Sequence, residues 1–144
     1  MPQEPLTLYK LIILYMLDRV NFPLTSAQVG DFILEKEYTS FLTLQKAISE
    51  LTDAGLISAQ SIRNRTHLLI TGEGLNTLSF FENRISDTIK DEINSFFKDN
   101  EMELRNEVSI LADYYKSTTG DYDAHLVAKE KNTKLVETLI LRTM

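Results

Sequence analysis

The chain has 144 residues and a hydrophobic fraction of 43%, so it is long enough for one ordinary domain with a packed core. It has no cysteine, which excludes both a disulfide framework and a thiolate metal site. Its formal net charge of −6 argues against a nucleic-acid interface spread over the whole surface, because phosphate binding requires clustered lysine and arginine. The longest wholly apolar run, residues 11–17, is far shorter than the roughly 18 residues of a membrane span. No signal sequence precedes this run. We therefore expect a soluble cytoplasmic protein with no membrane partner.

Charge is unevenly distributed along the chain. Residues 38–72 contain three basic and two acidic residues, whereas residues 82–144 contain nine basic and thirteen acidic ones. We therefore expect any contact with nucleic acid in the first of these two segments.

Two helices are expected at the start of the chain. The first begins near Thr7 and is apolar on nearly every side, which predicts a helix at the centre of the core. The Asn-Phe-Pro sequence at residues 21–23 ends it. A second helix follows Thr25, which forms a T-x-x-Q capping box with Gln28.

A third helix is predicted over residues 43–54, opening at Thr43 and ending at Gly55. Its apolar residues recur at i, i+3, i+4 and i+7, and they are Leu44, Ala47, Ile48 and Leu51. This register turns a polar set outward, namely Gln45, Lys46, Ser49, Glu50 and Thr52.

Two short apolar runs then flank a polar turn that contains Asn64, a residue type that tolerates positive φ. They predict a β-hairpin over residues 56–70. Three helices followed by a two-stranded hairpin are the order of elements in a winged helix-turn-helix.

Beyond the hairpin, apolar residues recur every three or four positions over residues 75–97, which predicts two helices or one kinked helix ending near residues 99–100. Ser86 and Asp87 are candidates to cap the second segment. Three later segments are rich in β-branched and aromatic residues and are separated by turn sequences. They predict a three-stranded antiparallel meander over residues 107–117, 121–130 and 134–143.

The predicted fold class is therefore α+β. Residues 1–85 would form a winged helix-turn-helix domain, and residues 86–144 a helical and antiparallel-sheet region for dimerisation or sensing.

The sequences "LTDAGLI" at residues 51–57 and "RNRTHLLITGEG" at residues 63–74 resemble the recognition-helix end and wing of bacterial winged-helix regulators, which typically read L-x-x-x-G-L-I, a hairpin, then T-x-x-G. Together with "LYKLIILYMLDRVNFPLT", "EYTSFLTLQKAISEL" and "ADYYKSTTGDYDA", almost the whole chain resembles an uncharacterised bacterial family with an N-terminal winged helix and a C-terminal α/β region. The resemblance implies a presumed transcriptional regulator, with no established ligand or operator. It also implies a further helix after residue 144, so that this chain would be cut short.

A winged helix would place its third helix in the major groove and its hairpin against the DNA backbone or minor groove. Glutamine side chains pair with adenine, and lysine and serine reach guanine or phosphate. The arginines of the hairpin would contact phosphates or enter a narrow minor groove. The candidate DNA contacts are Thr43, Gln45, Lys46, Ser49, Arg63, Asn64 and Arg65.

Two observations oppose this hypothesis. The hairpin arginines and the outer face of the third helix are also what an ordinary solvated surface would carry. Glu50 and Asp53 lie on the same helix and would repel phosphates if they faced them. The alternative function is a winged helix that binds another protein through its acidic C-terminal half and does not bind DNA.

The apolar positions after the hairpin are candidates for a homodimer interface, because a two-fold DNA reader usually needs a helix that spaces its two recognition helices. The candidate residues are Leu78, Phe81, Ile85, Ile89, Ile93, Phe96 and Phe97. Packing of the same residues against the meander, inside one chain, is the alternative.

Asp121, Asp123 and His125 alternate along a predicted strand, a spacing that points three metal-ligand types to one face. Three residues on one strand make a poor closed ligand set, so we interpret them as a hydrated strand edge and predict no metal site. No nucleophile-base pair or phosphate-binding glycine loop can be assembled, which predicts a non-enzyme without a cofactor. The sequence indicates no particular small-molecule effector.

Overall fold

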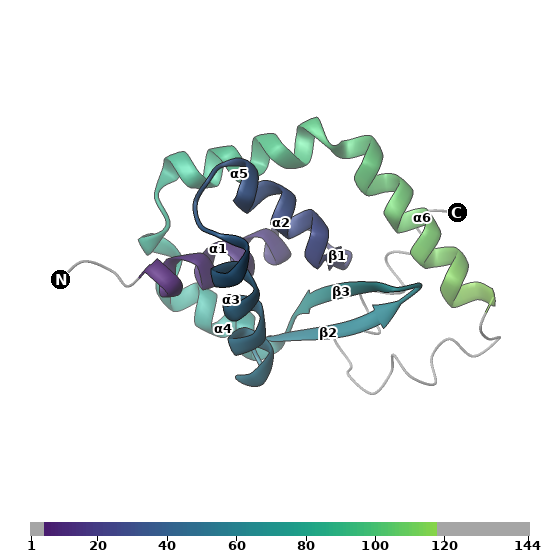
Figure 1. Ribbon diagram of the computed structural model, residues 1–144, viewed down its shortest axis with the longest axis horizontal. Coiled ribbons are helices and arrows are strands. Elements are labelled where there is room, and N and C mark those ends of the chain that lie inside the picture. The colour runs from purple at the N-terminus through teal and green to yellow at the C-terminus, as the bar shows by residue number, and fades with distance from the viewer. Residues whose placement is uncertain (1–4, 118–144) are drawn as a thin grey trace.

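A computed structural model describes residues 5–117 of the chain, with side chains as far as residue 113. This part is an α+β arrangement of helices packed with one small antiparallel sheet (Figure 1). Its elements are α1 (Pro5–Arg19), β1 (Leu24–Thr25), α2 (Ser26–Glu35), α3 (Phe41–Asp53), β2 (Ile57–Ile62), β3 (Arg65–Ile70), α4 (Gly72–Phe81), the 3-10 helix η1 (Glu82–Arg84), α5 (Asp87–Asp99) and α6 (Glu101–Ser117).

Helix α1 lies at the centre of the core, as its composition predicts. Every residue from Leu11 to Leu17 is buried, because α3, α4, η1 and β3 all pack around it. A helix enclosed on all sides needs apolar residues on all sides. The same core includes Ile93 of α5 and Leu104 of α6, so residues before and after position 85 share one core within the described part of the chain.

The sheet has the order β1-β3-β2, with β3 between two antiparallel partners. Strand β1 is only two residues long and pairs Thr25 with His67. Thr25 is also the N-cap of α2: its Oγ1 accepts a hydrogen bond from the Gln28 amide at 3.0 Å, and its own amide donates to Gln28 Oε1 at 2.9 Å. The predicted capping box is confirmed, and it joins the start of α2 to the sheet.

The base of the hairpin is closed by hydrogen bonds between two glycine-containing segments. Gly55 ends α3 with a φ of +76°, and the Thr71 hydroxyl donates to its carbonyl oxygen at 2.7 Å. The Thr71 amide donates to the Leu56 carbonyl oxygen at 3.1 Å, while Thr71 Oγ1 accepts from the Gly74 amide at 3.1 Å and caps α4. The end of α3, the sheet and the start of α4 are thus fixed together.

Gly74 is required at this joint for a steric reason. A Cβ atom at Gly74 would lie 2.1 Å from the Leu56 carbonyl oxygen, which is far inside van der Waals contact. The segments with the L-x-x-x-G-L-I and T-x-x-G patterns therefore lie against each other. The first supplies the carbonyl oxygens that Thr71 hydrogen-bonds, and the second supplies the space that the Leu56 carbonyl occupies beside Gly74.

The region after the hairpin forms two helices, α4 and α5, with η1 between them. Ser86 is the N-cap of α5, with its Oγ accepting from the Ile89 amide at 3.2 Å, and α5 ends at Asp99. The predictions of two helical segments, of a cap at Ser86 and of an end near residues 99–100 are confirmed.

Two sequence predictions were wrong. Residues 107–117 are not the first strand of a meander but the greater part of α6; the buried residues Leu104, Val108 and Leu111 recur at a helical spacing that outweighs the β-branched and aromatic composition. The other two predicted strands lie outside the described residues. Helix α3 begins at Phe41 rather than at Thr43, because Ser40 is its N-cap.

Replacement of Gly74 by alanine is expected to lower the free energy of unfolding by about 2 kcal/mol or more, since the obstructing atom belongs to the backbone and cannot rotate away. Gly72 lies two residues earlier in the same helix, and a Cβ atom at that position would have no neighbour within 4 Å. Gly72→Ala should therefore change stability by less than about 0.5 kcal/mol. Urea denaturation of the two variants measures the difference. Equal midpoints would contradict the steric account.

Candidate nucleic-acid interface

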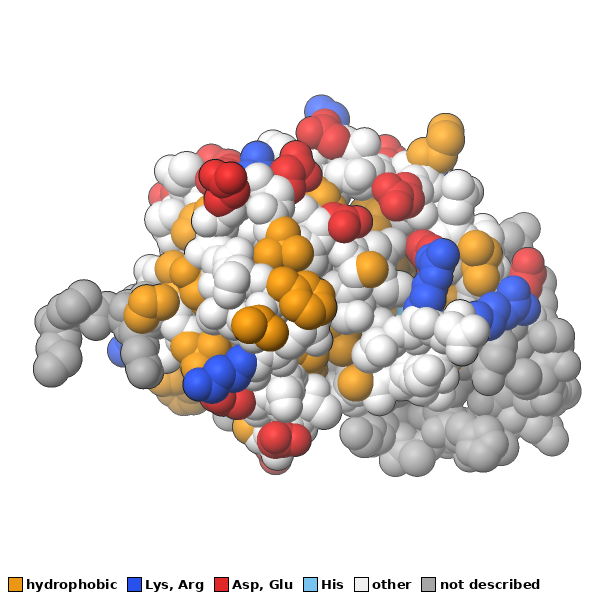
Figure 2. Space-filling model, in the orientation of Figure 1, with side chains coloured by type: hydrophobic (Ala, Val, Ile, Leu, Met, Phe, Trp, Pro, Cys, Tyr) orange, Lys and Arg blue, Asp and Glu red, His pale blue; other side chains and the backbone are white. Residues whose placement is uncertain are grey.

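The outward face of α3 begins one turn earlier than the sequence predicts. Leu42, Gln45, Lys46 and Ser49 are all exposed and follow the spacing i, i+3, i+4 and i+7, so they lie on one stripe of the helix. Figure 2 shows apolar side chains gathered on the part of the visible face that carries α2 and α3, whereas acidic side chains gather along α5 at the upper edge. The outward stripe of α3 is therefore mixed apolar and polar, and it continues to the exposed Asp53 at the end of the helix.

Thr43 does not belong to this stripe. It is the third residue of α3; its amide donates to Ser40 Oγ at 3.3 Å, and its hydroxyl lies 3.1 Å from the same oxygen. Sequence reasoning took Thr43 as the start of the helix and so missed Leu42 and Phe41, which are 79% and 59% exposed. Ser40, three residues before a threonine and followed by apolar residues, was the signal that could have identified them.

Glu50, an acidic residue of α3 that would oppose DNA binding, forms an ion pair with Lys10 of α1. Lys10 Nζ donates to Glu50 Oε1 at 2.6 Å, and this hydrogen bond lowers the pKa of the Glu50 carboxyl group. A lysine from another helix thus lies against the negative charge of Glu50. Asp53 is exposed at the last position of α3.

The hairpin tip is a two-residue turn formed by Arg63 and Asn64. Their φ angles are 51° and 64°, and positive φ at both central positions is the mark of a type I′ turn, which suits the twist of a hairpin. Asparagine adopts this region at little cost, but arginine does so at a cost of about 1 kcal/mol or more. The turn therefore places a guanidinium group at a position where glycine or asparagine would be more stable.

Arg65, the next residue, forms an ion pair with Glu107 of α6. Helix α6 passes beside the tip of the hairpin (Figure 1), and Ile62, His67, Ile110 and Leu111 line a small cavity of about 240 Å³ between them. The Glu107 side chain is 16% exposed and that of Arg65 is 56% exposed. Arg65 thus has an intramolecular partner, which a DNA phosphate would have to share or displace.

The residues predicted for a dimer interface mostly pack inside the chain. Leu78, Ile85 and Ile93 are 3% exposed or less, and Ile89, Phe96 and Phe97 are partly buried against the same core. Phe96 meets Phe32 of α2 edge-on, with ring centroids 5.3 Å apart. Within the described residues, these side chains pack inside the chain, with neighbours in α1 and α2. Phe81 retains an exposed fraction of 38%.

Comparison with protein families finds one matching family model, described as a domain of unknown function, DUF4364, over residues 9–142. The chain belongs to the DUF4364 family. Comparisons with curated proteins and with solved structures found no match.

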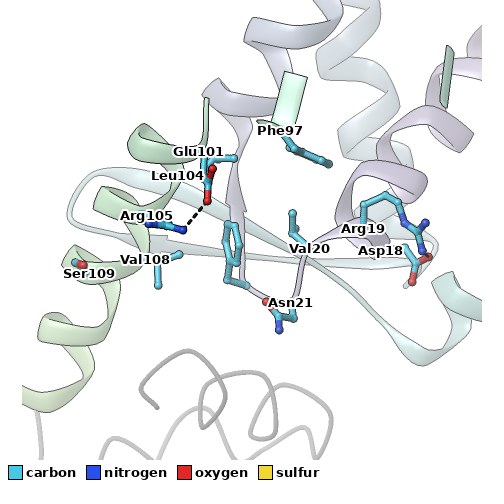
Figure 3. Close-up of a pocket in the computed structure, with 11 residues that line it drawn as sticks. Asp18, Arg19, Val20, Asn21, Phe97, Glu101, Leu104, Arg105, Val108 and Ser109 are labelled. Carbon is cyan, nitrogen blue, oxygen red and sulfur yellow. Dashed lines mark hydrogen bonds and ion pairs between the residues drawn. The ribbon is translucent and has the colours of Figure 1, made fainter. Parts of the chain in front are cut away.

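A second cavity of the DUF4364 chain lies between the end of α1 and the start of α6 (Figure 3). It is open to solvent and measures about 790 Å³, with an apolar lining that includes Val20, Phe97 and Leu104. Its charged groups are accompanied by opposite charges: Arg105 Nη2 lies 2.5 Å from Glu101 Oε1, and Arg19 Nη2 lies 3.8 Å from Asp18 Oδ2.

The described residues contain no cluster of three or more metal-ligand side chains, and Asp121, Asp123 and His125 lie outside them. Within residues 5–117, none of the helices combines the length and the apolar character that crossing a bilayer requires.

His67 of the DUF4364 chain is 7% exposed, and burial lowers the pKa of its imidazole below the ordinary value of 6.5. A hydrogen-bond contact of 3.2 Å between Nδ1 and the Arg65 carbonyl oxygen opposes the shift in pKa, and the Arg65 charge adds to it. Because the unfolded chain takes up the proton more readily, the contribution of His67 to stability is complete above pH 6.5 and is lost as the pH falls.

We expect an NMR titration of the histidine ring protons to give a midpoint below pH 6.5 for His67 in the folded chain. His125 is the only other histidine, so His125→Gln assigns the signal. A midpoint at or above 6.5 would show that the ring is not desolvated in solution.

Proposed function

We propose that this DUF4364 chain is a winged-helix DNA-binding protein and acts as a transcriptional regulator. The observation that carries the proposal is the outward face of α3, where Gln45, Lys46 and Ser49 are exposed together while Glu50 is engaged by Lys10. Hydrogen-bonding and basic side chains on one helical stripe are what base edges and phosphates accept.

The order of elements supports the same proposal. Helices α1, α2 and α3 precede a β2-β3 hairpin, and β1 adds a third strand to the sheet; this order of elements is the one expected of a winged helix. In this proposal α3 enters the major groove, and the hairpin lies along the backbone. The positive φ of Arg63 adds a specific argument, since an unfavourable backbone conformation is retained where the side chain is used.

Arg65 takes part in DNA binding only if it leaves or shares Glu107. A phosphate carries the same sign of charge as the Glu107 carboxylate, so the two compete for one guanidinium group. We therefore expect Arg65 to contribute less to DNA affinity than Lys46 does.

We also propose that the regulator acts as a homodimer, because specific sites are usually read as two half-sites. Sedimentation velocity at tens of micromolar is expected to give the mass of two chains. A single species with the mass of one chain, 16.5 kDa, at that concentration would remove the dimer from the proposal and leave DNA binding to be judged separately.

The alternative, a module that binds another protein, is favoured by one specific observation. Phe41 and Leu42 are two of the most exposed apolar residues in the described chain, and Lys46 is the only basic residue of α3. A protein-binding surface would use the apolar pair as its centre. DNA binding separates the two hypotheses directly.

The salt dependence of DNA affinity tests the proposal. Fluorescence anisotropy with duplex fragments from the source genome is expected to show an affinity that falls steeply with salt, because each phosphate contact releases counterions. Lys46→Gln and Arg63→Asn should each reduce the slope of log K against log salt by about 0.9 if each contacts one phosphate. Arg63→Asn removes the charge while keeping a residue type that accepts positive φ.

Lys98→Gln is the matched control, since Lys98 is exposed on α5, away from the proposed interface. It should leave the slope unchanged. Absence of binding at low salt would refute DNA binding and favour the protein-partner alternative. Equal losses in the control and in the two test variants would show a non-specific effect of total charge.

A further inference from the structure

The exposed stripe of α3 has an apolar residue at its N-terminal end. Leu42 is 79% exposed, and it precedes Gln45 and Lys46 by one helical turn. Phe41, at 59% exposed, lies beside it. On the free chain these side chains expose apolar surface to water. Burial of that surface against a suitable partner would be favourable.

We propose that Leu42 recognises the C5-methyl group of a thymine in the major groove, and so sets part of the DNA sequence preference of this chain. This inference rests on the proposed function. Within the major groove the thymine methyl is the apolar group that the base edges present, and apolar side chains contact it.

The position of Leu42 suits base contact for a geometric reason. Helix-turn-helix proteins contact base edges mainly with the N-terminal residues of the recognition helix. Leu42 is the second residue of α3, directly ahead of the proposed hydrogen-bonding residues on the same stripe. The polar Gln45, Lys46 and Ser49 beside it suit a groove that presents both hydrogen-bonding groups and methyl groups better than they suit the apolar centre of a protein interface.

The spacing along the helix predicts where the thymine lies. Leu42 and Gln45 are three residues apart, about 4.5 Å along the helix axis. Base pairs are spaced by about 3.4 Å, so the thymine should lie one or two base pairs from the base pair that Gln45 contacts.

Substitution of thymine by deoxyuridine tests the inference, because it removes only the methyl group. Selection from a random duplex pool with the full chain is expected to enrich sites with thymine at a fixed position. Replacing that thymine by deoxyuridine should weaken binding about fourfold, the effect of one lost apolar carbon contact. In Leu42→Ala the thymine and deoxyuridine sites should bind equally, because the partner of the methyl group is gone.

Met102→Ala is the matched control: Met102 is 77% exposed, on α6, and its variant should retain the fourfold preference for thymine. A native chain that binds duplexes in a salt-dependent way but shows no methyl effect, enriches no fixed thymine, or keeps the effect in Leu42→Ala would overturn this inference and leave DNA binding intact. Failure to bind any duplex at low salt would overturn both. In that case Phe41 and Leu42 become the centre of the protein-binding alternative.

Discussion

The contact between the Gly55–Leu56 and Thr71–Gly74 segments holds α3 and the hairpin, the proposed DNA-binding surface, in place. Thr71 bonds to two carbonyl oxygens of the first segment, and its hydroxyl also caps α4. The missing side chain of Gly74 allows the Leu56 carbonyl to approach. Because α3 ends and β2 begins at this joint, these hydrogen bonds and the close approach at Gly74 fix the end of α3 against the hairpin.

Ion pairs within the chain lie beside both parts of the proposed DNA-binding surface. Lys10 engages the carboxylate of Glu50, and the acidic side chains of α5 gather at a different edge of the molecule (Figure 2). At the hairpin tip an ion pair instead involves a basic residue, because Glu107 of α6 pairs with Arg65. Helix α6 therefore links the second half of the chain to the proposed DNA surface.

Local features were predictable from the sequence, and features that depend on distant contacts were not. The T-x-x-Q capping box and the end of the third helix at Gly55 follow from residues within one turn, and both were predicted. The pair between Lys10 and Glu50 spans 40 residues and leaves no local pattern. Helix α6 was mistaken for a strand because residue preference was weighed above the helical period of its buried residues. The start of α3 was misplaced because serine and threonine are both good N-caps; that error concealed Leu42.

DNA binding by α3 and the hairpin is tested most directly by NMR chemical-shift mapping of the ¹⁵N-labelled chain during titration with duplex DNA. The largest changes are expected at the amides of Leu42, Gln45, Lys46 and Ser49, with a second set at Arg63 and Asn64. Changes confined to α5 and α6, or no change at low salt, would contradict a DNA-binding surface formed by α3 and the hairpin.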